Sequence, residues 1–126
     1  MDLATQTHLT MLRDLLTYRQ TELRAEVHAA QLTRQEAEAA ATAEVSDQKD
    51  GALQQQLEGI DNAQEQRDID ELAQVELALK RLDDGAYGNC VDCCEPIPLE
   101  RLRVQPATQR CAVCQFGHER ALTRSR

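Results

Sequence analysis

The stretch CVDCCEPIPLERLRVQPATQRCAVC, residues 90–114, contains all five cysteines of the 126-residue chain. Four of them form two C-x2-C pairs, Cys90 with Cys93 and Cys111 with Cys114, with seventeen residues between the pairs. Each such pair makes a tight turn that offers two sulfur atoms to one tetrahedral ion. The spacing therefore predicts one structural Zn²⁺ held by four thiolates.

A zinc site closed by four protein ligands has no open position for a water molecule, so it supports structure and does not perform hydrolysis. Zinc binding of this kind supplies about 10–16 kcal/mol, which is enough to fold a segment with few apolar residues. The alternative is a set of free thiols or a thioredoxin-like redox pair, which needs a strand–helix–strand context that the sequence does not show. The sequence also shows no Ser/His/Asp set and no phosphate loop, so we do not expect an enzyme.

Two further residues near the cysteine pairs have open roles. Cys94 directly follows Cys93, and two adjacent side chains cannot easily face the same ion. Cys94 is then a tolerated substitution, an alternative ligand or an exposed redox thiol. His118, four positions after Cys114, is either a substitute ligand or a surface residue of a short closing helix.

Composition and charge limit the classes of function. The sequence shows no signal peptide and no apolar run long enough for a membrane span, so we expect a cytoplasmic protein whose thiols are reduced. The net charge is −8, with −10 in residues 1–84 and +2 in residues 85–126. Because affinity for nucleic acid rests mainly on Lys and Arg, we expect no direct sequence-specific DNA binding.

Two long segments, residues 3–45 and 52–84, have apolar residues at helical spacing and contain no proline. Each has one narrow apolar stripe, which favours an antiparallel coiled-coil hairpin with arms of about 50–60 Å. We therefore predict a mainly α monomer, with the hairpin in residues 1–84 and the zinc finger and a short C-terminal helix in residues 85–126. The stripe positions are Leu9, Leu12, Leu16, Leu23, Val27, Ala30, Ala37 and Ala41, then Leu53, Leu57, Ile60, Ile69, Leu72, Val75, Leu79 and Leu82.

The turn between the two helices is SDQKDGA, residues 46–52. Asp47 and Asp50 are good N-cap residues, and Gly51 breaks the helical pattern. One interpretation is that these acids only cap the second helix. The other is that they form an acidic tip that acts on a partner, and helical periodicity does not separate the two.

The chain resembles the DksA/TraR family of bacterial RNA polymerase-binding transcription regulators. The resemblance rests on RLDDGAYGNC at 81–90, both cysteine pairs, Ile97, the dipeptide 101–102 and Pro106. It also rests on the tip motif D-x-x-D-x-A, formed by Asp47, Asp50 and Ala52 at the spacing of the longer members. The resemblance covers the chain from about residue 9 onward.

The resemblance implies a specific mode of action. Members of the family insert the hairpin into the secondary channel of RNA polymerase and alter the lifetime of open complexes, in DksA as part of the stringent response with guanosine tetraphosphate. Carried over by position, Asp47, Asp50 and Ala52 are the tip contacts with polymerase. Arg67, on the second helix, matches a basic position that also contacts polymerase.

Three features depart from the family pattern. Cys94 stands where the family usually has glycine, which tolerates positive φ. About eight residues precede the hairpin, fewer than in long DksA proteins. Gln74, Gln105 and Gln115 replace basic residues that help DksA bind the alarmone, and glutamine offers no positive charge to phosphate. We therefore expect little or no dependence on guanosine tetraphosphate.

Two other classes of function remain open from the sequence. The chain could be a zinc-dependent protein-interaction module that does not act on polymerase, or a thiol or zinc redox sensor that uses Cys94.

Overall fold

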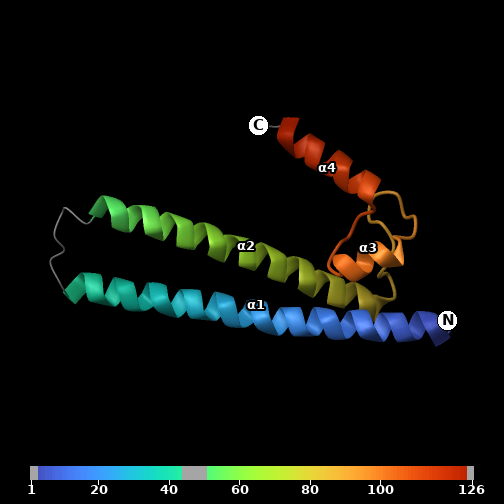
Figure 1. Ribbon diagram of the computed structural model, residues 1–126, viewed down its shortest axis with the longest axis horizontal. Coiled ribbons are helices and arrows are strands. Elements are labelled where there is room, and N and C mark those ends of the chain that lie inside the picture. Colours follow the sequence, from blue (N-terminus) through green and yellow to red (C-terminus); the bar gives the residue numbers. More distant parts are fainter. Residues whose placement is uncertain (1–2, 44–50, 125–126) are drawn as a thin grey trace. The chain divides into compact units, whose positions relative to one another are not determined.

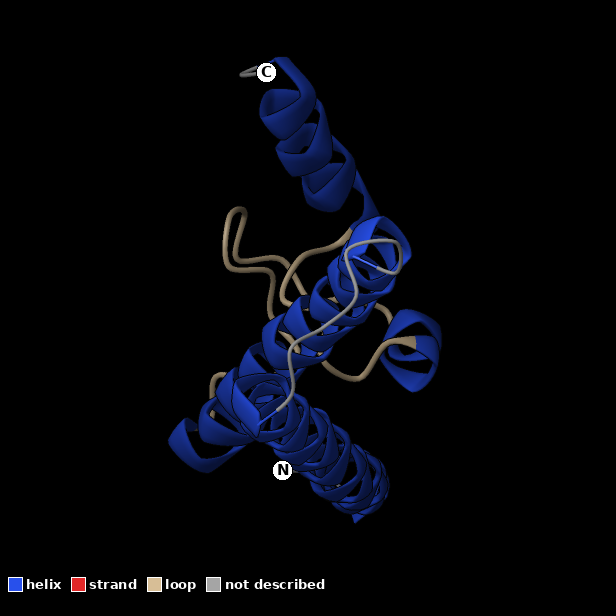
Figure 2. Cartoon of the chain, turned by 90° about the vertical axis from the view of Figure 1, so that its left-hand side faces the viewer, coloured by secondary structure: helices blue, strands red, loops and turns tan. Residues whose placement is uncertain are grey.

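A computed structural model of the chain describes residues 3–43 and 51–124, apart from some side chains near the ends of these ranges. These residues form the helices α1 (Leu3–Ala43), α2 (Gly51–Asp84), α3 (Leu99–Val104) and α4 (Ala112–Arg124), which are labelled in Figure 1. The described residues contain no strand (Figure 2), although Asn89 and Pro96 form an isolated antiparallel bridge. The predicted mainly α fold, with two long helices, a four-cysteine cluster and a closing helix, is confirmed.

Local sequence explains how the long helices run and end. α1 contains neither glycine nor proline, so nothing in its backbone interrupts it. α2 ends in a Schellman motif, in which Gly85 has φ 76° and its N–H donates to Leu82 O at 3.3 Å, while Ala86 N–H donates to Arg81 O at 2.9 Å. No described helix is both long and apolar enough to cross a membrane.

The chain divides into two compact units, Met1–Arg19 with Gln74–Arg126, and Gln20–Ala73. The first unit thus combines the first part of α1, the last part of α2, and the cysteine-rich segment. The second contains the remaining parts of α1 and α2. We expected one domain in residues 1–84 and another in residues 85–126, each continuous in the chain. The compact units do not test that division, so it stays a prediction.

The first unit has an apolar core. Leu12 and Leu16 of α1 and Val75 and Ala78 of α2 are buried where these helices pack together. Leu12 is also part of a second cluster, which extends the core into the cysteine-rich segment through Cys90, Ile97 and Leu102. The base of the helices therefore supplies apolar surface that the small finger lacks by itself.

The second unit is held differently. Among its described side chains the buried ones are Leu23 and two carboxylates, Glu65 and Asp68. The guanidinium Nη1 of Arg34 donates to Oε2 of Glu65 at 2.6 Å, and Gln64 Nε2 donates to Asp68 Oδ1 at 3.1 Å. In the second unit, polar contacts therefore replace part of the apolar contact that two long helices normally make with each other.

The predicted apolar stripe is therefore only partly correct. Ile60 is 66% exposed and Ile69 is 36% exposed, and Ala37 and Ala41 are exposed as well. A stripe drawn from hydrophobic periodicity cannot include a buried acid, because a carboxylate is buried only where a partner offsets the cost of desolvation. The partner of Glu65, Arg34, lies 31 positions earlier in the chain.

The Arg34–Glu65 pair should stabilise the second unit more than an exposed pair stabilises the first. Arg34→Ala leaves the buried Glu65 carboxylate without its partner, so we expect a loss of about 1–3 kcal/mol in the free energy of unfolding. The matched control is Arg13→Ala, because the Arg13–Asp83 pair at 2.8 Å is exposed on both sides. That change should cost less than about 1 kcal/mol.

Urea unfolding followed by helical circular dichroism measures both variants. Replacing both members of the buried pair by leucine should be close to neutral, because no unpaired charge remains. Equal losses for Arg34→Ala and Arg13→Ala would contradict a structural role for the buried pair.

Candidate metal centre

The first cysteine pair lies in a tight turn held by backbone hydrogen bonds. Cys94 N–H donates to Cys90 O at 3.0 Å, and Cys90 N–H donates to Glu95 O at 2.8 Å. Ile97 N–H donates to Gly88 O at 2.7 Å and closes the loop below the turn. The side chain of Arg81 in α2 donates to the carbonyls of Ala86 and Asn89, which ties this loop to the helix.

The second pair spans the start of α4. Cys111 immediately precedes the helix, Cys114 lies in its first turn, and Gln115 N–H donates to Cys111 O at 2.9 Å. The helical turn thereby fixes the separation of the two sulfur atoms. The direction of α4 is fixed together with them.

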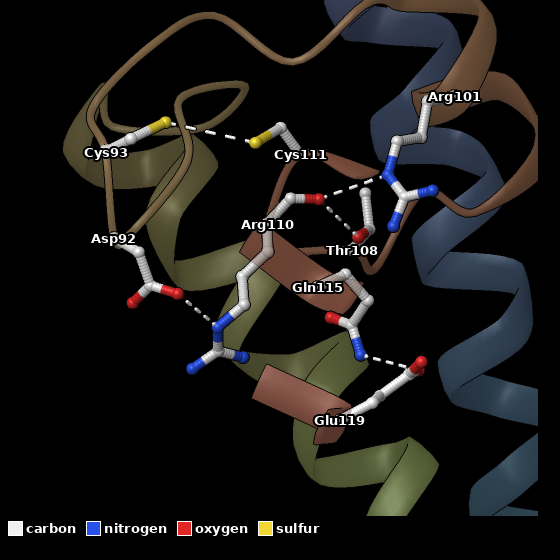
Figure 3. Close-up of polar contacts among 8 residues, drawn as sticks. All are labelled: Asp92, Cys93, Arg101, Thr108, Arg110, Cys111, Gln115 and Glu119. Atoms are coloured by element: carbon white, nitrogen blue, oxygen red, sulfur yellow. Dashed lines mark hydrogen bonds and ion pairs between the residues drawn. The ribbon is translucent and has the colours of Figure 1, made fainter. Parts of the chain in front are cut away.

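Side chains and backbone brace the two pairs against each other (Figure 3). Arg110 Nε lies 2.8 Å from Asp92 Oδ2, and Val91 N–H donates to Gln109 O at 2.9 Å. The Arg110 carbonyl accepts hydrogen bonds from Arg101 Nε and from the Thr108 hydroxyl, both at 3.1 Å. The residue before the second pair is thus held from three directions.

The four predicted ligands come together as one cluster. The sulfur atoms of Cys90, Cys93, Cys111 and Cys114 all lie within 4.8 Å of one another, and those of Cys93 and Cys111 are 3.9 Å apart. A tetrahedral ion with Zn–S bonds of about 2.3 Å separates its sulfurs by about 3.8 Å. The donor set fits one Zn²⁺, so the four cysteines are positioned to bind one metal ion.

The ionisation of these thiols also fits a cation site. A hydrogen bond from the backbone N–H of Cys93, and weaker ones from Cys111 and Asp92, lower the pKa of the Cys90 thiol to about 6, although burial opposes them. The pKa of the Cys114 thiol is raised, chiefly by the neighbouring Cys111 thiol. Four clustered thiols resist full ionisation on their own, and a bound dication would stabilise all four as thiolates.

Cys94 is exposed and does not belong to the four-sulfur cluster. Its φ is 64°, in the left-handed region that favours glycine. Among the described residues, Cys94 is the non-glycine residue with a positive φ. The positive φ expected at the position where the family usually has glycine is therefore confirmed. A β-carbon in this region carries a steric cost.

A small apolar cluster supports the metal centre. Buried Cys90 packs with Leu12, Ile97 and Leu102, and half-buried Tyr87 packs against this cluster. The Tyr87 hydroxyl donates to Pro106 O at 2.8 Å. Burial raises the pKa of Tyr87 to about 12, although Arg81 opposes the effect, so the phenol stays a neutral donor at ordinary pH.

The other predicted site residues lie elsewhere or outside the described residues. Asp47 and Asp50 are not among the described residues, and Ala52 lies in α2 with its side chain not described. Arg67 is exposed on α2. His118 is exposed on α4 and is not part of the sulfur cluster, so the structure does not bring it to the metal centre.

Sequence reasoning missed the braces of the site. Asp92, between the first two cysteines, and Arg110, directly before the third, carry opposite charges at positions that the two turns bring together. Because each of these charged residues is adjacent in sequence to a predicted ligand, their ion pair could have been predicted from the two cysteine motifs. The contribution of Leu12 had no signal, because it lies 78 positions before Cys90 in the chain.

The fold and the site together define a helical protein with a structural four-cysteine zinc finger. Residues 85–120 match the family described as the prokaryotic dksA/traR C4-type zinc finger. Over 49 residues the chain is 39% identical to "RNA polymerase-binding transcription factor DksA" of Caulobacter vibrioides, a match that covers 39% of this chain and 34% of the relative. It is also 40% identical over 53 residues to an uncharacterized protein of Aquifex aeolicus, covering 42% of this chain and 37% of that one.

These matches span little more than a third of the length of the curated relatives. A solved structure extends the likeness: that of transcription factor DksA2 from Pseudomonas aeruginosa, with a TM-score of 0.72 and 26% sequence identity over 93% of this chain and 87% of that chain. The finger family, the DksA relative and the DksA2 structure all support the resemblance to the DksA/TraR family that the sequence suggested.

The metal centre leads to a direct prediction. Purified protein should contain about one equivalent of zinc, and Cys111→Ser should abolish tight binding, because three thiolates leave the tetrahedral site incomplete. The finger should then lose its fold, since zinc binding supplies about 10–16 kcal/mol, while α1 and α2 keep most of their helicity.

Metal analysis and circular dichroism measure the two effects, with Cys94→Ser as a matched control outside the four-sulfur cluster. Protein that folds fully without metal would contradict the assignment.

Replacing Cys94 separates its backbone strain from its thiol. Cys94→Gly should raise the free energy of unfolding of the zinc-loaded protein by about 1 kcal/mol, because glycine adopts positive φ without a steric cost. Cys94→Ala removes the thiol and keeps the β-carbon, so it should leave stability unchanged. Denaturant titrations with zinc present measure both, and a gain of stability in the alanine variant would show that the thiol, and not φ, is the cause.

Proposed function

We propose that this protein is a transcription regulator that binds bacterial RNA polymerase and inserts its hairpin tip into the secondary channel, where it alters the stability of open complexes. The observation that carries the proposal is the likeness to transcription factor DksA2 over 93% of this chain. The DksA relative of Caulobacter vibrioides, which is 39% identical over 49 residues, supports polymerase as the partner.

The proposed contacts lie on the hairpin. Asp47, Asp50 and Ala52 form the acidic tip in this proposal, and Arg67, exposed on α2, adds a basic contact. The tip motif and the zinc finger occur at the separation seen in the longer members of the family, which supports the assignment of these roles.

The rest of the proposal follows from this mode of action. The protein acts by binding polymerase in the cytoplasm and catalyses no reaction of its own. The acidic charge of residues 1–84, net −10, suits insertion into a protein channel and opposes direct binding to DNA phosphates.

The proposal includes little or no dependence on guanosine tetraphosphate. Gln74 and Gln105 are exposed and uncharged, and the Gln115 amide donates to Glu119 Oε1 at 3.0 Å, so an acid neighbours that position (Figure 3). Arg101, a nearby cation, already donates from Nε to the Arg110 carbonyl.

The exposure of Cys93 and Cys94 favours one alternative, a thiol or zinc redox sensor. A sensor of this kind should release zinc under mild peroxide treatment, and Cys94→Ala should slow the release. The other alternative, a zinc-dependent protein-interaction module, would bind some other protein and leave polymerase unbound in a pull-down of the core enzyme.

The deciding experiment is competition with a transcript-cleavage factor for the polymerase channel. Zinc-loaded protein should displace the factor and inhibit factor-stimulated cleavage as its concentration rises. A version with Cys111→Ser should compete poorly. Binding to polymerase with no effect on the factor would rule out the secondary channel.

The tip acids allow a test that distinguishes charge from helix capping. Asn caps a helix about as well as Asp, so Asp50→Asn should change stability by less than about 0.5 kcal/mol. If the negative charge acts within polymerase, the same variant should lose most of its effect on transcription while its affinity for polymerase stays within about threefold, or about 0.7 kcal/mol.

In vitro transcription and a binding titration measure the two quantities, with Asp47→Asn as the paired variant. Full transcriptional activity in both variants would mean that the acids serve only as caps.

Alarmone independence has its own test. A charge-assisted phosphate contact is worth about 1.5–3 kcal/mol, so the absence of two or three such contacts weakens an alarmone site by orders of magnitude. On polymerase that lacks its other alarmone site, the effect of this protein on a ribosomal RNA promoter should be flat as guanosine tetraphosphate is titrated. Introducing lysine at positions 74, 105 and 115 should create a response, and strong synergy with the unaltered chain would overturn this part of the proposal.

A further inference from the structure

Two contacts join the cysteine pairs to each other without using a sulfur atom. The first is the ion pair of Asp92 and Arg110, in which Nε lies 2.8 Å from Oδ2 (Figure 3). The second is the backbone hydrogen bond from Val91 N–H to Gln109 O at 2.9 Å. One end of each contact lies between the two ligands of the first pair, and the other end directly precedes the second pair. The ion pair is called the Asp92–Arg110 brace below.

The backbone of Arg110 is itself fixed to the apolar core. Its carbonyl accepts hydrogen bonds from Arg101 Nε and from the Thr108 hydroxyl, both at 3.1 Å. Arg101 lies in α3 beside Leu102, which is buried in the core cluster. Since the Arg110 carbonyl belongs to the planar peptide unit that leads to Cys111, these bonds fix the backbone at that ligand. The core therefore supports the second pair through one residue, and the same residue reaches the first pair.

The ligands differ in exposure, which indicates where the metal centre opens. Cys90 is buried in the core cluster, Cys111 and Cys114 are half-buried, and Cys93 is exposed. A competing chelator reaches an exposed sulfur first, so we expect loss of the ion to begin at Cys93. Asp92 directly precedes Cys93 in the chain. The brace therefore holds the first turn beside the ligand that leaves most easily.

We propose that Asp92 and Arg110 are positioning residues of the metal centre, whose ion pair keeps the two cysteine pairs together and thereby slows the release of zinc. Neither residue belongs to the four-sulfur cluster. When the Cys93 sulfur leaves the ion, the brace keeps that sulfur at a high effective concentration beside the other three, so it binds again before the ion escapes. Groups outside the ligand set tune metal centres in this way, because they fix the orientation of the ligands.

The exposure of the brace sets the size of the expected effect. The side chain of Asp92 is 47% exposed and that of Arg110 is 23% exposed. Exposed ion pairs change an equilibrium by up to about fivefold, whereas groups that orient metal ligands change metal affinity by about 10–100-fold. The brace lies between these two classes. Removing either member should therefore speed the release of zinc by about threefold to tenfold.

Transfer of zinc from the loaded full chain to an excess of a chromogenic chelator measures the release rate, with a phosphine reductant present to keep the thiols reduced. Asp92→Ala and Arg110→Ala should each show the faster release, with the zinc site fully loaded at the start and helical circular dichroism unchanged. The matched controls are Glu100→Ala and Arg103→Ala, which remove the same charges from exposed positions of α3. Both controls should release zinc at the rate of the unaltered chain.

Combining the two substitutions shows whether the two residues act through one contact. Asp92→Ala and Arg110→Ala in the same chain should release zinc no faster than the faster single variant, because each change removes the same ion pair. Asp92→Asn repeats the test with almost no change in shape, since it removes the charge and keeps the size of the side chain.

Salt provides a readout that a purely structural role would not change. Between about 0.1 M and about 1 M salt, the screening length falls from about 10 Å to about 3 Å. Release from the unaltered chain should therefore accelerate by about twofold over this range, because the brace is partly exposed. The double variant has no brace to screen, so its release should not respond.

Four results would overturn the proposal. The single variants could release zinc at the unaltered rate. Their effects could multiply in the double variant, which would mean that the two residues act separately. The unaltered chain and the double variant could respond equally to salt. The unaltered chain could take up no zinc, which would also overturn the assignment of the metal. Since every measurement uses the isolated chain, none of these results depends on the proposed function.

Discussion

The structure of the C-terminal segment depends on bringing four thiols within 4.8 Å of one another. Without a cation the thiols oppose one another's ionisation, as the pKa of Cys114, raised chiefly by the neighbouring Cys111 thiol, indicates. A dication held by the four thiolates would remove this conflict and would join the two turns into one rigid element. The direction of α4, the loop that contains Ile97 and the brace between Arg110 and Asp92 all follow from that geometry.

The two units are stabilised by different means, and this difference suits the proposed function. The first unit combines an apolar core with the metal centre, so it can serve as a firm base. The second buries Glu65 and Asp68, and it exposes Ile60. A segment held by directional polar contacts gains less stability from burial than an apolar seam does, and in some coiled coils such buried polar groups select one register of the helices. A single register in the second unit would suit the proposed action of the tip.

The surfaces of the first unit add a second level of organisation. The first unit leaves large apolar side chains in water, Val113 and Phe116 on α4 and the stripe of Met11, Leu15 and Tyr18 on α1.

The sequence by itself determined the class of fold, the four metal ligands and the kinship of the finger. Helical periodicity and the spacing of cysteine pairs are local properties that a linear chain records. The tertiary structure decided the rest: that Leu12 completes the core beneath Cys90, that Glu65 is buried against Arg34, and that α4 is left uncovered. These features depend on residues far apart in the chain, and burial of a charge in particular is favourable only when the fold supplies the partner.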